Sequence, residues 1–205
     1  MTEPTVFVVD DDEAVRHCLG VLLRLAGLKA ETFSDGMAFL DAWDPERPGC
    51  LVLDARMPKM SGIEVQRWMG AQEVPLPVII ITGHGDLAMA VTAFREGVFD
   101  FLEKPFDDAY FVERVKAAID RDAETRRRRE RNRSAAAKLR GLSPREREVM
   151  ELMVEGCANK TIAARLGIGV RTVEGHRAHV MRKLDVTSLS ELTRLRLSLD
   201  GDTLK

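Results

Sequence analysis

Four short apolar runs alternate with helix-length segments over the first 120 residues. They are Val-Phe-Val-Val at 6–9, Cys-Leu-Val-Leu at 50–53, Val-Ile-Ile-Ile at 78–81 and Phe-Asp-Phe-Leu at 99–102. Short apolar runs separated by helical patterns are typical of buried parallel strands joined by crossover helices. With a further strand predicted near residues 30–33, this part should form a doubly wound, five-stranded parallel α/β sheet.

Polar side chains follow these runs, where the strands of one sheet would end. Asp10 and Asp11 come after the first run, Asp54 after the second, Thr82 after the third and Lys104 two residues beyond the last. Because the carboxyl ends of parallel strands meet at one edge of the sheet, we expect these side chains to share a pocket. Three carboxylates, a hydroxyl and an ammonium group there suit a metal ion and a phosphoryl group.

Phosphorylation of a carboxylate needs the residue types that this pocket would contain. A carboxylate can accept a phosphoryl group as a mixed anhydride, but its charge repels the incoming phosphate. Mg²⁺ relieves that repulsion and prefers oxygen ligands. Asp10, Asp11, Asp54 and the backbone carbonyl of Arg56 are the predicted ligands. Asp54, on the central strand, is the predicted phosphoacceptor.

The other members of the pocket also have simpler interpretations when taken singly. Lys104 would neutralise a phosphoryl oxygen, and Thr82 would hydrogen-bond only to the phosphorylated form. Alone, Asp10 and Asp11 could be acids at a helix start, and Lys104 a surface lysine. Asp12 keeps that interpretation and is predicted to cap a helix. Only the joint pattern favours a phosphorylation site.

Charge is divided unevenly along the chain. Residues 1–120 carry 21 acidic and 11 basic residues, and residues 121–205 carry 12 acidic and 20 basic residues, so the net charges are −10 and +8. This split indicates an acidic domain and a basic domain with different partners, and the basic part favours a polyanion such as nucleic acid. We predict domains at 1–120 and 141–205. The Arg-rich segment 121–140 is predicted to be a charged, partly helical linker, although a basic run can also contact DNA phosphates.

Residues 141–205 have helical patterns only and are predicted to form a four-helix, all-α domain. Ser143-Pro144-Arg145-Glu146 is a helix start of the capping-box type. A tight turn between the second and third helices, near Gly167, indicates a helix-turn-helix. On the third helix, the predicted DNA-contacting face carries Glu174, Gly175, Ala178, His179 and Arg182. Residues suited to phosphate contacts lie at helix starts or flanks, namely Lys160, Thr161, Arg171, Thr172 and Arg177.

The N-terminal part resembles the receiver domain of bacterial response regulators, most closely those of the FixJ type. Five motifs carry the resemblance: Val-Val-Asp-Asp-Asp at 8–12, Leu-Asp-Ala-Arg-Met-Pro at 53–58, Met-Ser-Gly at 60–62, Ile-Thr-Gly-His-Gly-Asp at 81–86 and Glu-Lys-Pro-Phe at 103–106. The resemblance implies a flavodoxin-like fold, Mg²⁺ at the acids, and phosphorylation by a partner histidine kinase. It further implies a switch made by Thr82 and Phe101, and a cis peptide bond at Lys104-Pro105.

The C-terminal part resembles the LuxR/NarL-type DNA-binding domain. The motifs are Leu-Ser-Pro-Arg-Glu-Arg-Glu-Val at 142–149, Asn-Lys-Thr-Ile-Ala at 159–163 and Arg-Thr-Val-Glu-Gly-His-Arg at 171–177. Gly175 departs from the Val that is usual in this family. Together the two resemblances imply a transcription regulator that binds promoter DNA, forms a homodimer through its receiver domain when phosphorylated, and works with RNA polymerase. FixJ-type relatives are mostly activators, so activation is the expectation.

Two other functions stay open at this point. The acidic pocket could serve a phosphatase or phosphotransferase acting on an outside substrate, or the receiver could be vestigial in a phosphorylation-independent DNA-binding protein. The intact acid set argues against the latter. Three cysteines without metal-ligand spacing fit a reducing cytosol, and no apolar run is long enough for a membrane span, so the expected location is cytoplasmic with no membrane partner.

Overall fold

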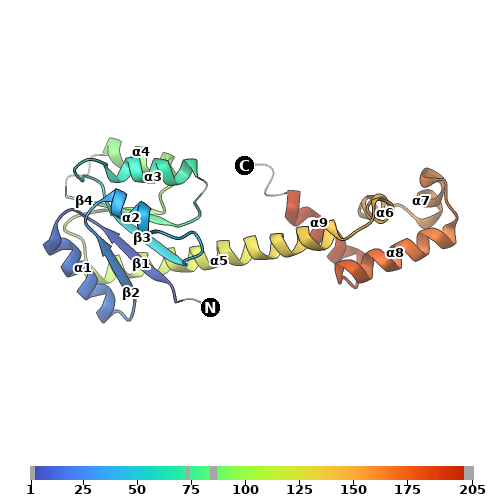
Figure 1. The fold of residues 1–205 in the computed structure, drawn as a ribbon, viewed down its shortest axis with the longest axis horizontal. Helices are drawn as coiled ribbons and strands as arrows, with labels where there is room; N and C mark the ends of the chain where they lie inside the picture. Colours follow the sequence, from blue (N-terminus) through green and yellow to red (C-terminus); the bar gives the residue numbers. More distant parts are fainter. Residues whose placement is uncertain (1–2, 73, 84–86, 201–205) are drawn as a thin grey trace. The chain divides into compact units, whose positions relative to one another are not determined.

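The computed structural model describes residues 3–72, 74–83 and 87–200, and Figure 1 shows it as a ribbon. The chain forms two compact units, Met1–Arg126 and Arg127–Lys205. Residues 84–86 of the Ile-Thr-Gly-His-Gly-Asp motif lie outside the described residues. No described helix combines the length and apolar character needed to cross a membrane.

A parallel five-stranded sheet forms the centre of the first unit. Its strands are β1 (Thr5–Val9), β2 (Lys29–Phe33), β3 (Gly49–Asp54), β4 (Val78–Thr82) and β5 (Asp100–Glu103). The order β2-β1-β3-β4-β5 places β3 in the middle, with all neighbours parallel. The predicted doubly wound, flavodoxin-like sheet is therefore confirmed.

Helices cover both faces of the sheet (Figure 1). They are α1 (Glu13–Leu25), α2 (Gly36–Ala42), α3 (Gly62–Ala71), α4 (Leu87–Arg95) and α5 (Asp108–Arg140). Helices α2, α3 and α4 pack on one face through residues such as Phe39, Val65 and Ala93. Helices α1 and α5 pack on the other through residues such as Leu23 and Phe111. Because both faces are buried, the inner strands β1, β3 and β4 are almost continuously apolar and polar residues collect at their ends, whereas the edge strand β2 also carries Lys29 and Glu31.

In the second unit, the described residues after α5 form helices joined by short loops, with no strand among them. It contains α6 (Pro144–Val154), α7 (Asn159–Leu166), α8 (Val170–Leu184) and α9 (Leu189–Asp200). Ser143 and Glu146 form the predicted capping box at the start of α6. Gly167 ends α7 with a left-handed φ of 64°, a conformation that glycine adopts without steric cost. The buried core includes Val149, Met153, Ile162, Val173, Val180, Leu184 and Leu192.

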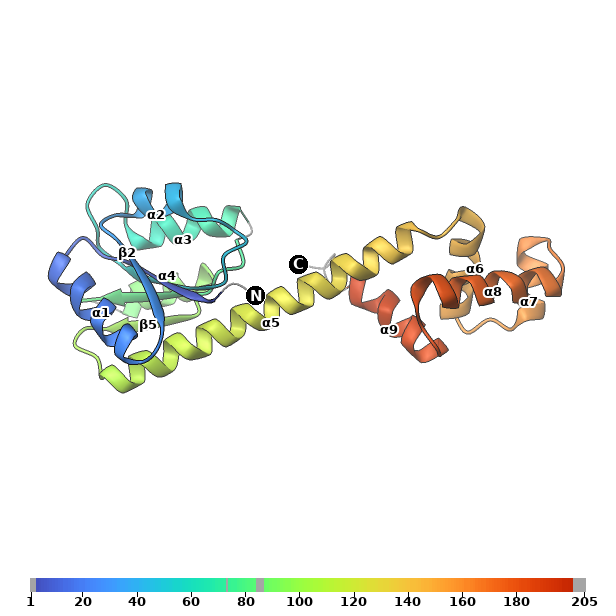
Figure 2. The same ribbon diagram turned by 60° about the horizontal axis from the view of Figure 1, so that its bottom comes forward.

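Helix α5 is longer than the sequence pattern indicated. The segment 121–140, predicted to be only partly helical, is helical throughout (Figure 2). Its Arg, Ala and Glu residues are good helix formers, and its polarity does not oppose a helix that is exposed to water. The boundary between the two compact units falls within α5, after Arg126.

Candidate phosphorylation site and DNA-binding helices

The predicted pocket residues lie at the carboxyl edge of the sheet. Asp10 follows β1, Asp54 ends β3 and Thr82 ends β4, while Lys104 directly follows β5. Backbone hydrogen bonds hold these ends in register, because Lys104 N donates to the Thr82 carbonyl at 2.7 Å and Ala55 N donates to the Ile81 carbonyl at 2.8 Å. Parallel pairing thus brings together residues that lie up to 94 positions apart.

Lys104 bridges two buried carboxylates. Its Nζ donates to Asp10 Oδ2 at 2.8 Å and to Asp54 Oδ1 at 2.8 Å. Asp10 and Asp54 are almost completely buried, with exposed fractions of 1% and 7%. Burial alone would lower the pKa of the Lys104 ammonium, but its hydrogen bonds to both carboxylates outweigh burial and raise it. Lys104 is therefore a firmly held cation at the centre of the site.

Backbone amides hold the remaining carboxylate oxygens. Asp10 Oδ1 accepts from Asp12 N at 2.9 Å, and Asp54 Oδ2 accepts from Arg56 N at 2.7 Å. Burial raises the pKa of the Asp10 carboxyl, and the hydrogen bond from Lys104 only partly offsets that effect. Asp12 caps α1 through its side chain, in agreement with the sequence prediction.

The structure does not bring every predicted residue into this contact. Asp11 is exposed, and among the described residues no three His, Cys, Asp or Glu side chains are grouped closely enough to hold a metal ion. Thr82 is buried, and Phe101 is partly buried against the core beneath α2, α3 and α4. The Lys104-Pro105 peptide bond is cis, as the family resemblance implied.

Two residues near the site were not singled out from the sequence. Arg16 Nη1 donates to the carbonyl oxygens of Asp10 and Asp11 at 2.8 and 2.9 Å, which secures the loop after β1. Gly62 begins α3 directly against β3, and a Cβ on it would lie 2.3 Å from the Asp54 carbonyl oxygen. In the sequence, the glycine of the Met-Ser-Gly motif at 60–62 is the signal that α3 and the end of β3 approach each other closely at this point.

The predicted DNA-contacting side chains are mostly exposed on α7 and α8. On α8, Glu174, Gly175, Ala178, His179 and Arg182 are exposed, whereas Val173 and Val180 are buried. At the helix starts Lys160, Thr161, Arg171 and Thr172 are exposed, and Arg177 is half-buried. The helix therefore has a buried side and a free, polar side, as a helix that enters a DNA groove requires.

A buried carboxylate connects α6 to this helix. Glu146 Oε2 accepts from Lys183 Nζ at 2.6 Å and from Ser143 N at 2.8 Å. His179 Nδ1 lies 3.8 Å from Glu146 Oε1, which is longer than a hydrogen bond. The Lys183 hydrogen bond lowers the pKa of Glu146 to about 2, which keeps this carboxylate ionised at neutral pH.

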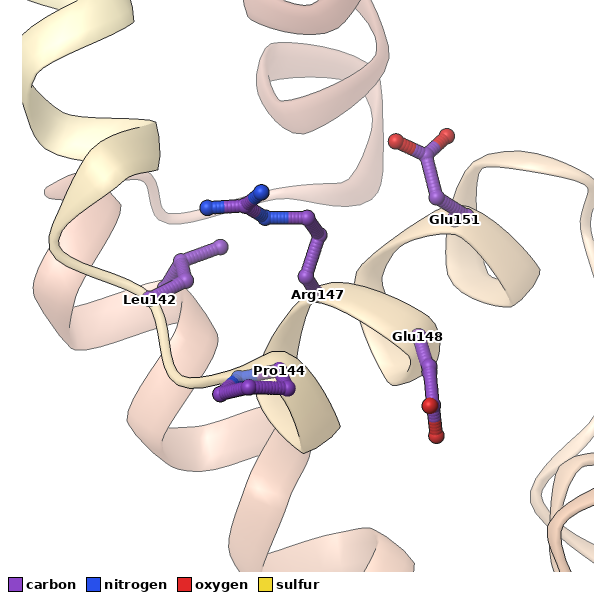
Figure 3. Close-up of a pocket in the computed structure, with 5 residues that line it drawn as sticks. All are labelled: Leu142, Pro144, Arg147, Glu148 and Glu151. Atoms are coloured by element: carbon purple, nitrogen blue, oxygen red, sulfur yellow. The ribbon is translucent and has the colours of Figure 1, made fainter.

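Two cavities of the structure are lined by residues other than those predicted for the two candidate sites. An open cavity of about 510 Å³ lies at the start of α6. Figure 3 shows the residues that line it, namely Leu142, Pro144, Arg147, Glu148 and Glu151. A second cavity, of about 350 Å³, lies between α1 and β2 and is lined by residues that include Arg16, His17 and Arg24. Neither cavity is lined by Asp10, Asp54 or Lys104.

Comparison with protein families matches each unit separately. The model described as "Response regulator receiver domain" matches residues 6–116. The model described as "Bacterial regulatory proteins, luxR family" matches residues 140–196. The two matched segments contain the carboxylate site and the exposed face of α8, respectively.

Curated proteins and solved structures resemble the chain along nearly its whole length. The transcriptional regulatory protein FixJ of Azorhizobium caulinodans is 47% identical over 94% of this chain and 91% of its own length. The response regulator protein TodT of Pseudomonas putida is 38% identical over 93% of this chain and 84% of its own length. The structure of the response regulator StyR has a TM-score of 0.85 at 44% identity, covering 95% of this chain and 98% of StyR. The structure of full-length FixJ from B. japonicum has a TM-score of 0.60 at 43% identity, covering 98% of this chain and 99% of that FixJ chain.

Proposed function

Because this chain belongs to the response regulators that join a receiver domain to a LuxR-family DNA-binding domain, it is a phosphorylation-activated transcription regulator, and we propose that Asp54 is its phosphoacceptor. The observation that supports Asp54 is its place at the end of the central strand, buried and hydrogen-bonded to Lys104. The chain is a regulator and not an enzyme acting on an outside substrate. We further propose domain limits at 1–120 and 141–205, joined by 121–140.

The proposed reaction transfers a phosphoryl group from a histidine of a partner kinase to Asp54. A carboxylate oxygen of Asp54 attacks phosphorus, the P–N bond breaks, and its electron pair leaves with the imidazole nitrogen. Lys104 already lies 2.8 Å from Asp54 Oδ1, so its ammonium is placed to neutralise a phosphoryl oxygen. The short bond from Arg56 N fixes the orientation of the Asp54 carboxylate.

The donor set at this edge fits Mg²⁺. Asp10 and Asp54 supply buried carboxylate oxygens that lie close together, since both accept a hydrogen bond from Lys104 Nζ, and hard divalent cations prefer carboxylate oxygens as ligands. Asp10, Asp11, Asp54 and the carbonyl of Arg56 would hold the ion. When bound, Mg²⁺ would offset the repulsion between the Asp54 carboxylate and the phosphate. Arg16 would keep the loop with the acid pair in place, through its bonds to the carbonyls of Asp10 and Asp11.

Phosphorylation is proposed to act through Thr82 and Phe101. Thr82 would donate a hydrogen bond to the aspartyl phosphate, and the partly buried Phe101 would change its packing in response. The surface formed by α4, β5 and α5 would then pair two copies of the chain as a homodimer. Val91, Phe94 and Tyr110 are large exposed apolar or aromatic residues on α4 and α5 that support this assignment.

The dimer is proposed to place two α8 helices in adjacent major grooves of promoter DNA. Glu174, Gly175, Ala178, His179 and Arg182 would contact bases or nearby phosphates. Lys160, Thr161, Arg171, Thr172 and Arg177 would contact the backbone. The regulator is proposed to act as an activator together with RNA polymerase, in the cytoplasm. The printed name of the FixJ relatives, transcriptional regulatory protein, supports the role in transcription.

Replacement of the proposed phosphoacceptor tests this function directly. Asp54→Asn should abolish covalent labelling of the full chain by radiolabelled acetyl phosphate, because the amide cannot form an acylphosphate. EDTA should abolish labelling of the unaltered chain. Asp41→Asn, at an exposed acid on α2, is the matched control and should label normally. Label that persists on the Asp54 variant would refute the assignment.

The second measurement links that site to DNA. Beryllofluoride, which mimics the bound phosphoryl group, should raise the affinity of the unaltered chain for DNA and should leave the Asp54→Asn variant unchanged. An equal effect on both proteins, or none on either, would favour a DNA-binding protein whose receiver is not used.

A further inference from the structure

A strongly basic segment of α5 lies outside both matched families. The family models end at residue 116 and begin again at residue 140. Between residues 127 and 140 the sequence has seven Lys and Arg residues and a single acid, Glu130. Nothing in the proposed phosphorylation or DNA contacts of α8 uses this segment.

Three arginines of this segment share one side of the helix. Arg127 and Arg131 are four residues apart, and Arg128 is three residues before Arg131, so their side chains project from adjacent positions. We call Arg127, Arg128 and Arg131 the arginine stripe. All three are exposed, and in the described parts of the chain none of them forms an ion pair with a carboxylate. Arg131 Nε instead donates to the Arg127 carbonyl of its own helix.

Other basic residues of α5 are neutralised within the protein. Arg126 pairs with Asp122 at 2.8 Å, and Lys138 lies 3.4 Å from an Asp185 carboxylate oxygen. The arginine stripe contrasts with them, because its charges are not paired with carboxylates of the described residues. Like charges three and four residues apart repel one another and oppose helix formation. A polyanion would remove that repulsion and supply the missing partners.

The stripe belongs to the same compact unit as the helix-turn-helix. That unit begins at Arg127. Lys138, which is seven residues after Arg131 and on the same side of α5, donates from Nζ to the carbonyl of Leu184 at 3.2 Å. Leu184 is the last residue of α8. This side of α5 therefore meets the end of the proposed DNA-contacting helix, and the stripe begins about 10 Å farther along α5.

We propose that the arginine stripe is a second DNA-binding element, which contacts backbone phosphates of the duplex that flanks the site bound by α8. Guanidinium groups match phosphate geometry and carry no information about base sequence in such contacts. The stripe would therefore strengthen binding to all DNA equally. This inference rests on the proposed function of α8 in DNA binding.

The test compares the full chain with a triple variant, Arg127→Gln/Arg128→Gln/Arg131→Gln. Glutamine keeps the helix propensity of arginine, and circular dichroism checks that the helix is retained. The probes are a 30-base-pair duplex selected from a random pool with the unaltered chain, and a scrambled duplex of the same length. Dissociation constants are measured between 50 and 200 mM NaCl. The control, Lys29→Gln/Arg67→Gln/Lys116→Gln, removes the same charge from exposed positions of the receiver.

The triple variant should bind both duplexes more weakly by a similar factor, roughly tenfold or more at low salt. The slope of log K against log [NaCl] should become shallower by about 2 to 3, because each lost phosphate contact contributes about 0.9. The ratio of the dissociation constants for the two duplexes should not change.

A salt-dependence slope of the triple variant equal to that of the receiver control would overturn the inference. Tighter binding by the triple variant would also overturn it and favour an acidic protein surface as the partner. Failure of the unaltered chain to bind any duplex would instead refute the proposed function.

Discussion

Lys104 is the side chain on which the chemistry of the site depends most. It bridges Asp10 and Asp54, which parallel pairing brings together although neither is near it in sequence. Its positive charge makes two buried carboxylates tolerable before any phosphoryl group or metal ion arrives, because an unpaired buried charge is costly. The same ammonium would neutralise a phosphoryl oxygen after phosphorylation, so Lys104 would stabilise both the unphosphorylated and the phosphorylated protein.

Lys104→Gln should lower the free energy of unfolding by about 2 kcal/mol near neutral pH, because a charge-assisted pair of hydrogen bonds is lost. Burial already raises the pKa of Asp10, and losing Lys104 raises it further. Protonation of a carboxyl with a raised pKa favours the folded state as the pH falls. The loss should therefore be smaller at pH 5 than at pH 8.

Urea unfolding at the two pH values checks this expectation. Lys116→Gln, at an exposed position of α5, is the control and should change stability little at either pH. Equal losses for the two variants would show that Lys104 carries no special electrostatic role.

Glu146 is the corresponding residue of the second unit. Glu146→Gln preserves the capping-box geometry and removes the charge that pairs with Lys183, so it should cost about 1 to 2 kcal/mol at pH 7. The pKa of Glu146 is lowered from 4.5 to about 2. Its stabilisation is thus complete above pH 4.5 and is lost as the pH falls towards 2.

Chemical unfolding of both proteins between pH 7 and pH 2.5 should show the difference between them shrinking below pH 4.5. Glu148→Gln, at an exposed acid nearby on α6, should stay within about 0.5 kcal/mol of the unaltered chain throughout. A difference that does not depend on pH would argue against the ion pair as its source.

Among the elements, α3 is placed by contact with the strand that ends at Asp54. Gly62 begins α3 where any side chain would collide with the Asp54 carbonyl, whereas a Cβ added to Gly70, near the end of the same helix, would meet no atom within 4 Å. Gly62 therefore allows the backbone of α3 to pack against the end of β3, and Gly70 has no such role.

Gly62→Ala should lower the stability by about 2 kcal/mol and slow acetyl-phosphate labelling, because α3 and the end of β3 must move apart. Gly70→Ala should be neutral or stabilising by up to about 1 kcal/mol, since alanine is the better helix former. Thermal unfolding and labelling rates of the two variants separate these effects. Similar changes in stability and labelling rate for the two variants would contradict the close contact between Gly62 and the Asp54 carbonyl.

For the molecule as a whole, α5 is attached to each unit by separate interactions. In the first unit, the buried Asp122 accepts from Gly49 N at 2.9 Å and from Arg126 Nε at 2.8 Å, and Arg126 Nη2 donates to the Arg47 carbonyl at 2.7 Å. In the second, Ala135 is buried and Lys138 donates to the Leu184 carbonyl. The two sets have no residue in common, so each unit should unfold with its own set.

Asp122→Asn should lower the melting temperature of the first unit alone, with a loss of about 2 kcal/mol from the buried network. Both tryptophans, Trp43 and Trp68, lie in that unit, so their fluorescence reports it selectively. Circular dichroism reports both units. Glu146→Gln should leave the tryptophan transition unchanged and shift only a second transition seen by circular dichroism. A shift of both transitions by either variant would show that the units unfold together.

Local patterns in the sequence were sufficient to predict the alternation of strands and helices, the parallel sheet and two of the helix N-caps. These features depend on residues that are close together in the sequence, so the sequence alone is enough to predict them. Examples are the apolar runs, Asp12 before α1 and the Ser143–Glu146 capping box. The full extent of α5 is not evident from the sequence, because a solvated helix has no apolar periodicity to reveal it. The sequence motifs and the matching family models indicate the same family.

Contacts between distant residues required the tertiary structure. The sequence placed Asp10, Asp11, Asp54 and Lys104 at one sheet edge, yet only folding shows that Lys104 joins two of these acids while Asp11 is exposed. The Asp122 network at the opposite edge has no sequence signature at all. Periodicity determines which face of an element is buried, whereas the pairing of side chains depends on distances between elements, and these arise only when the cores pack.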